Sequence, residues 1–177
     1  MNEILKTLKN IFEEQFFLDK GSKKTDDILR RDIDKFNIEF PNIITDFNSN
    51  LKSTFPNVVI ENWTQFFNLD RCIRFLIRFD DENRFICQLS IYGYFSVYQS
   101  PCYFVDGKYF FGEKKFIDIE EIEVCNQFYE CANILPNSLE WLDRKTLNQK
   151  VFDLSIKEIN YIHIIKVADT LFTNHYL

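Results

Sequence analysis

Seven acidic side chains, of the type that serves acid–base chemistry or electrostatic attraction, gather between Lys115 and Arg144. No Lys or Arg lies between those two residues. The seven are Asp118, Glu120, Glu121, Glu123, Glu130, Glu140 and Asp143. The chain has a net charge of −6, so the residues outside this acidic segment together carry +1, the difference between −6 and −7. Such a concentration of one sign speeds association with a basic partner and repels nucleic acid.

Carboxylates could also act as general acids and bases or bind Mg²⁺, but their local patterns favour structural roles. Residues 80–82, with the sequence DDE, fall in a predicted hairpin turn, where short polar side chains stabilise the turn. Residues 118–123, with the sequence DIEEIE, begin a predicted helix, where carboxylates favour the positive end of the helix dipole. We therefore predict no catalytic carboxylate.

The residues that other active sites require are few or widely spaced. The two histidines, His163 and His175, and the five cysteines show no spacing typical of a zinc site. The four glycines are too dispersed to form a phosphate-binding loop. The sequence predicts no metal, no cofactor and no catalytic residue. An enzyme with an unrecognised carboxylate or Cys–His site stays open as an alternative, because such partners meet in space rather than in sequence.

A second set of side chains suited to binding lies in the segment RFICQLSIYGYFSVY, residues 84–98. Phe85, Cys87 and the alternate residues after them are mostly apolar, which is typical of the core face of a strand. The other face carries tyrosines. We predict one long strand here, in a hairpin with a strand over 71–79 and with Phe79 opposite Phe85.

This register brings arginines and tyrosines onto one face of the hairpin. It places Arg74 opposite Ser90, Arg78 opposite Ile86, and Cys72 opposite Tyr92. Arginine with tyrosine suits a protein interface, and it also suits stacking with single-stranded RNA. A helix packed over this face is the third interpretation. The members of this Tyr/Arg face are Arg74, Arg78, Gln88, Ser90, Tyr92, Tyr94 and Tyr98.

Helical patterns occupy both ends of the chain and strand patterns occupy its middle. Asp118 with Glu121, and Ser155 with Glu158, are spaced as capping boxes, which predicts a helix start at each. Asp106-Gly107 predicts a two-residue hairpin turn. The predicted helices cover 2–18, 26–36, 41–56, 118–135 and 155–172, and the predicted strands cover 58–63, 71–79, 84–98 and a hairpin over 103–111.

These patterns predict an α+β fold in a single domain, residues 1–177. It consists of a helical part over 1–56, an antiparallel meander of about four to five strands over 57–117, and helices over 118–177 packed on the sheet. The acidic pI of about 5.0 argues against DNA as a partner, and no apolar run is long enough to span a membrane. The cysteines and the N-terminal sequence indicate a cytoplasmic protein, with a monomer or a homodimer left open.

A small, acidic α+β domain without a recognisable set of catalytic residues is similar in type to the immunity proteins that bacteria encode beside polymorphic or contact-delivered toxins. Size, acidity and a composition rich in Phe, Asn, Ile and Lys carry this resemblance. It implies a non-enzymatic protein that binds a toxin domain, often a basic one, and neutralises it.

The candidate partner-binding residues come from the two surfaces described above. The alternative function is a module that binds single-stranded RNA through the tyrosines and arginines of the hairpin. The candidate residues are Glu120, Glu121, Glu123, Glu130, Arg74, Arg78, Tyr92, Tyr94 and Tyr98.

Overall fold

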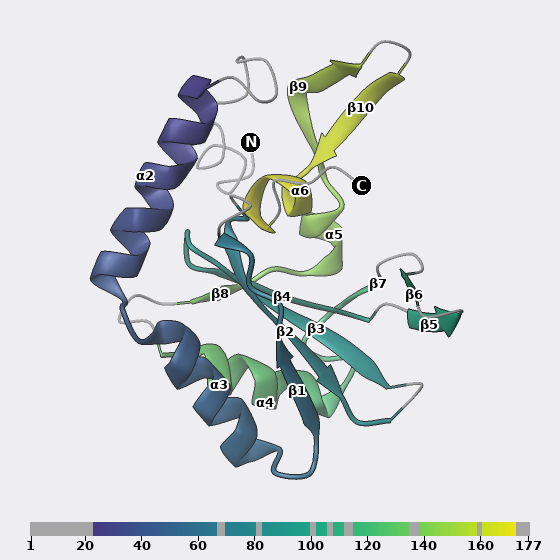
Figure 1. Ribbon diagram of the computed structural model, residues 1–177. Coiled ribbons are helices and arrows are strands. Elements are labelled where there is room, and N and C mark those ends of the chain that lie inside the picture. The colour runs from purple at the N-terminus through teal and green to yellow at the C-terminus, as the bar shows by residue number, and fades with distance from the viewer. Residues whose placement is uncertain are drawn as a thin grey trace.

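The computed structural model describes residues 23–66, 70–80, 83–99, 102–105, 108–111, 115–134, 139–158 and 161–172. The predicted helix over 2–18 lies outside these residues. The α+β class is confirmed, with helices before and after a central sheet (Figure 1). The described helices are α2 (Lys23–Glu39), α3 (Ile43–Thr54), α4 (Glu123–Ala132), α5 (Arg144–Leu147) and α6 (Val167–Phe172).

The main sheet has the strand order β1-β2-β3-β4-β7, with every neighbouring pair antiparallel. A further short strand, β8 (Glu140–Trp141), pairs parallel with β4. The sheet is therefore mixed rather than a pure antiparallel meander. Its other strands are β1 (Val59–Asn62), β2 (Cys72–Arg78), β3 (Arg84–Ser90), β4 (Tyr94–Gln99) and β7 (Lys115–Ile117).

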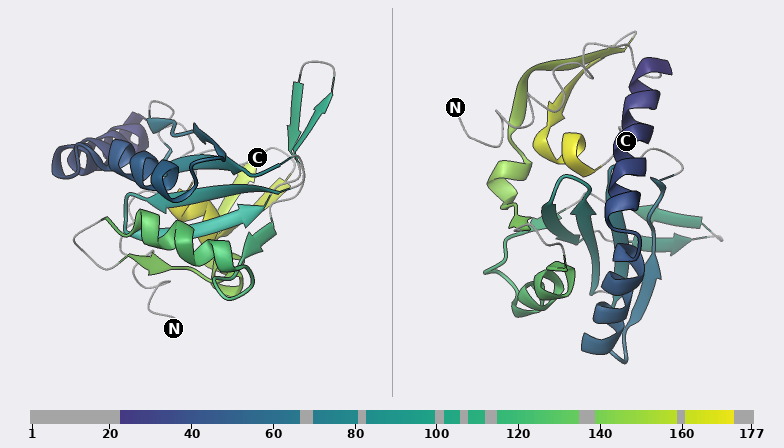
Figure 2. Two further views of the ribbon diagram at one scale, coloured as in Figure 1. Left: turned by 90° about the horizontal axis from the view of Figure 1, so that it is seen from below. Right: turned by 90° about the vertical axis from the view of Figure 1, so that its left-hand side faces the viewer.

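Two separate ribbons of two strands each lie outside the main sheet. The predicted hairpin over 103–111 is confirmed as β5 (Cys102–Val105) and β6 (Lys108–Phe111), which pair Val105 with Lys108, while the predicted turn residues Asp106 and Gly107 lie outside the described residues. This ribbon projects from the body of the molecule (Figure 2). The second ribbon joins β9 (Lys150–Glu158) to β10 (Tyr161–Lys166).

The prediction of one strand over 84–98 was wrong, because the chain turns back between β3 and β4. Gly93 has a φ of +83°, a conformation that residues with a Cβ rarely adopt. Its N–H donates to the carbonyl of Ser90 at 3.0 Å and closes the turn. Leu89 therefore faces Phe95 across the hairpin, and the alternation of side chains continues unchanged from one strand to the next.

The register between β2 and β3 also differs from the prediction by two residues. Arg74 pairs with Gln88 rather than Ser90, Arg78 with Arg84 rather than Ile86, and Cys72 with Ser90 rather than Tyr92. The Asp80 carboxylate causes this, because it accepts from the backbone N–H and the side-chain amide of Asn83, both at 2.7 Å. The tightened turn pairs Phe79 with Asn83, whose carbonyl accepts from the Phe79 N–H at 3.0 Å.

Two helix predictions in the C-terminal part need correction. The predicted helix over 155–172 is β9, β10 and the short α6. Phe152, Leu154 and Ile156 alternate with polar residues, and three of the six residues 161–166 are isoleucine, so strand periodicity prevailed over the capping-box spacing. Helix α4 begins at Glu123 rather than at Asp118.

Helices lie on both faces of the sheet (Figures 1 and 2), and an apolar layer fills the space between each face and its helices. The first face packs against α3 and α4, and its largest buried side chains are phenylalanines. The second face packs against residues of α5 and α6. Among the helices of the described residues, none has the length and apolar character that crossing a membrane requires.

Candidate functional site

Arg144 folds back onto the beginning of the acidic segment. Its backbone N–H donates to Asp118 Oδ1 at 2.6 Å, and its Nε donates to the carbonyl of Phe116 at 2.8 Å. Its Nη2 forms an ion pair with Glu121 Oε2. Because the Asp118 carboxylate is engaged by Arg144, it does not cap the helix, which explains why α4 begins later than predicted. Among the described residues of the acidic segment, Glu121 thus has a cationic side chain as its partner, whereas Asp118 accepts from a neutral backbone N–H.

The outward side of α4 presents carboxylates and amides at helical spacing. Glu123 and Glu130 lie on this side, and Glu120 precedes it in the turn before the helix. None of these three carboxylates forms a salt bridge within the part of the chain that the structure describes. We call this surface the α4 outer face; its members are Glu120, Glu123, Asn126, Gln127, Glu130 and Asn133, all exposed.

The Tyr/Arg face of the hairpin is covered by α6 and its neighbours rather than open to solvent. Tyr94 and Tyr98 are buried at 9% and 5% exposure, which leaves no stacking platform at either ring. Arg78 is half-buried and faces Val59 and Arg84 on the neighbouring strands. The structure therefore agrees with the third interpretation of this face, in which a helix packs over it.

Tyr92 lies at the turn between β3 and β4 and reaches helix α2. Its hydroxyl donates to Asp32 Oδ2 on α2 at 3.4 Å. Burial raises the pKa of the Tyr92 hydroxyl, and the nearby Asp32 carboxylate adds to the shift. The side chain therefore acts as a neutral hydrogen-bond donor that joins α2 to the sheet.

A buried polar cluster holds Arg74 beneath α6. Arg74 Nη1 forms an ion pair with Asp70 Oδ2 at 2.8 Å, and Asp70 is completely buried. The Gln88 amide is assigned with its oxygen toward the guanidinium, where it accepts from Arg74 Nε at 3.1 Å. Arg74 Nη2 donates to the carbonyl of Phe172 at 3.1 Å.

Two further donors of this cluster reach the end of α6. Cys72 Sγ donates to the carbonyl of Phe172 at 2.7 Å, and Ser90 Oγ donates to that of Leu171 at 2.9 Å. The cluster therefore supplies three donors to two successive carbonyls at the C-terminus of the helix. We call it the polar socket; its members are Asp70, Cys72, Arg74, Gln88 and Ser90.

Burial of Tyr98 beside the polar socket predicts a loss of stability at high pH. Burial raises the pKa of Tyr98 to about 12, against about 10 in an unfolded chain. Above pH ~10 the unfolded chain loses this proton while the folded chain keeps it, so the unfolded state gains. The free energy of unfolding should fall by about 2–3 kcal/mol as the pH rises from about 10 to about 12.

Urea titrations of wild type and Tyr98→Phe across that range test this prediction. Phenylalanine keeps the ring and has no proton to lose, so the variant should lose less stability with rising pH than wild type does. Equal pH dependence in the two proteins would show that Tyr98 ionises normally in the fold.

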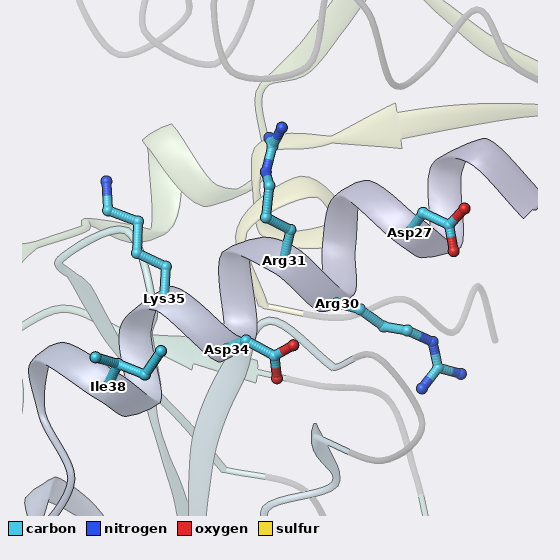
Figure 3. A pocket seen from close by; sticks show the side chains of 6 residues that line it. All are labelled: Asp27, Arg30, Arg31, Asp34, Lys35 and Ile38. Carbon is cyan, nitrogen blue, oxygen red and sulfur yellow. The ribbon is translucent and has the colours of Figure 1, made fainter.

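A hollow on the surface of α2 is lined, within the part of the chain that the structure describes, by residues of that helix. Arg31 and Lys35 extend to one side of it, and Arg30 and Asp34 to the other (Figure 3). A small-molecule site has polar groups converging from several elements, which this hollow lacks among the described residues. Within those residues there is also no group of three His, Cys, Asp or Glu side chains that could hold a metal ion.

Comparison with protein-family models, with curated proteins and with solved structures finds no match to this chain. The residues that the sequence interpretation missed are Asp70 and the α6 carbonyls, which complete the polar socket. Asp70 lies four residues before Arg74, and this i, i+4 spacing was the one signal that could have paired them.

Proposed function

We propose that this protein is a non-enzymatic binding module, of the type of an immunity protein, which neutralises a basic toxin domain. The observation that carries the proposal is the α4 outer face. Its carboxylates Glu120, Glu123 and Glu130 are exposed and have no ionic partner among the described residues. A basic partner would supply the missing positive charge and would be steered to this face.

The ion pairs within the chain narrow the candidate contact residues. Glu121 already pairs with Arg144, and both side chains are partly exposed. Glu121 is therefore a weaker candidate than the three unpaired carboxylates. The exposed amides of Asn126 and Gln127, between Glu123 and Glu130, can donate and accept hydrogen bonds, which lets the face select among basic partners.

The alternative of RNA binding requires tyrosine rings that bases can reach. Tyr94 and Tyr98 are buried beneath the C-terminal part of the chain, and the Tyr92 hydroxyl is engaged by Asp32. The acidic α4 outer face repels phosphate. Protein binding through α4 is therefore the function that we favour.

Charge reversal on the α4 outer face should slow association with the partner. In the variant Glu120→Lys, Glu123→Lys, Glu130→Lys, the association rate constant at low salt should fall by about tenfold or more. The dependence of that rate on salt should flatten as well, because the attraction that salt screens is gone. Stopped-flow mixing measures both, with a partner isolated by pull-down and identified by mass spectrometry.

A matched control places the same charge change elsewhere on the surface. Asp27, Asp34 and Glu39 are exposed on α2, and their replacement by Lys changes the net charge equally. This variant should associate at nearly the wild-type rate. Equal slowing in the two triple variants would show that the effect comes from net charge and that α4 is not the contact surface. An acidic partner, or one whose toxicity survives co-expression with this protein, would contradict the proposed function itself.

A further inference from the structure

The two faces of the sheet differ in the chemistry that they bury. Each face packs an apolar cluster, the first against α3 and α4 and the second against α5 and α6, but only the second buries several polar strand residues as well. The buried polar strand residues Gln88, Ser90 and Ser96 lie on the second face, together with the Arg74–Asp70 ion pair. Buried polar groups regain hydration when they are exposed to water, whereas apolar groups lose stabilisation. Opening the second face therefore costs less free energy per unit area than opening the first.

Helix α6 is the element that closes the second face, and it is short. It buries Val167, Leu171 and Phe172 against the sheet, and the polar socket holds its last two carbonyls. A helix of this length has little stability of its own and depends on these contacts. Because these contacts all lie on one side of a single short element, α6 can leave the sheet without disturbing the first face, and such local opening costs less free energy than unfolding of the whole domain.

We propose that α6 is a displaceable cover, and that the polar socket beneath it is a second binding surface that α6 keeps closed. The socket binds α6 by donating to carbonyls at the end of a helix that carries two large apolar residues, Leu171 and Phe172. The occupant that replaces α6 is therefore a short helical segment of another protein chain that ends in the same way. Displacement of α6 does not require the α4 outer face to bind a partner.

The cysteines of the chain provide an internal test. Cys72 lies in the polar socket under α6, and Cys87 lies on the first face of the same sheet, and both are completely buried. The full chain is alkylated with N-ethylmaleimide, and each cysteine is quantified by peptide mass spectrometry against its rate in denatured protein. If α6 opens locally, Cys72 should react at least tenfold faster than Cys87. Equal rates for the two thiols would mean that both react only through global unfolding, and would overturn the proposal.

Two matched leucine substitutions separate local opening from general instability. Leu171→Ala weakens α6 alone and should speed alkylation of Cys72 about 30-fold or more, with Cys87 nearly unchanged. Leu51→Ala removes an equally buried leucine of α3 and should raise the rates of the two thiols together. A Leu171→Ala variant that raises both rates equally would show that α6 is part of the global folding unit.

A peptide probe tests the binding surface itself. The peptide VADTLFTNHYL copies residues 167–177, and it is added to the full-length Leu171→Ala variant during alkylation. It should protect Cys72 in a saturable manner, while a peptide with alanine in place of the residues corresponding to Leu171 and Phe172 should not. Failure of the native peptide to protect Cys72 would contradict a socket that accepts an external helix.

Discussion

Replacement of Asp70 by alanine is expected to lower the free energy of unfolding by about 3–5 kcal/mol. Asp70 is completely buried and forms the ion pair with Arg74. Burial alone would favour loss of the Arg74 charge, but the neighbouring Cys72, Tyr98 and Asp70 outweigh it and raise the pKa of Arg74. The guanidinium therefore stays charged, and without Asp70 its charge remains buried without a carboxylate. Urea denaturation measures the loss.

Two further variants show whether the loss comes from a buried charge. Glu121→Ala breaks the ion pair with Arg144, where both side chains are more than a third exposed, and should cost less than about 1 kcal/mol. Combining Asp70→Ala with Arg74→Met removes both charges and should recover part of the stability. Similar losses from Asp70→Ala and Glu121→Ala would contradict the assignment of Asp70 as an obligatory partner.

The second large effect is expected at Phe47, whose replacement by alanine should cost about 3–5 kcal/mol. Phe47 is completely buried on α3, and its ring lies 5.2 Å from that of Phe75 on β2. The centroid of the Phe47 ring also lies 6.4 Å from that of Phe95 on β4. One side chain thus joins the helix to two strands, and its removal leaves a cavity that the rigid sheet cannot fill. Urea denaturation, with circular dichroism as the signal, measures this effect.

The matched comparison is an apolar residue that is mostly exposed to solvent. Ile38 on α2 is 81% exposed, and Ile38→Ala should change the free energy of unfolding by no more than about 0.5 kcal/mol. If Phe47→Ala were equally mild, α3 would not be anchored to the sheet as the ring contacts indicate.

The alternation of side chains in residues 84–98 predicted the two faces of the sheet even though the chain reverses there. Cys87 pairs with Val97 and Leu89 with Phe95, so odd-numbered residues stay on one face through the turn. The register error between β2 and β3 was also an even number of residues, which preserves the face. Burial against one core therefore made the faces predictable, whereas the position of the turn depended on one glycine in an unusual conformation.

The C-terminal part was not predictable because its local patterns conflict. Residues 155–172 show a capping-box spacing and helical repeats of apolar residues, yet they also carry β-branched residues over 161–166. The antiparallel pairing of β9 with β10 favoured the strand conformation, since a hairpin provides backbone hydrogen bonds to both segments at once. Only the last six described residues of that stretch became helix.

The acidic segment illustrates the same division between local and distant information. Counting charges located it without any structure, because charge is a property of composition. Which carboxylates remain unpaired depended on Arg144, which folds back to Asp118 and Glu121. That pairing joins residues more than twenty positions apart, and no local spacing encodes it.

The sequence by itself determined the α+β class, the apolar faces of the strands, the β5–β6 hairpin and the negative charge around α4. These features follow from periodicity, turn residues and composition, which act over a few residues. Tertiary structure alone decided that α6 covers the Tyr/Arg face and that Asp70 balances Arg74. Those outcomes depend on contacts between segments far apart in the chain, where a buried charge and the end of a helix must each find a partner.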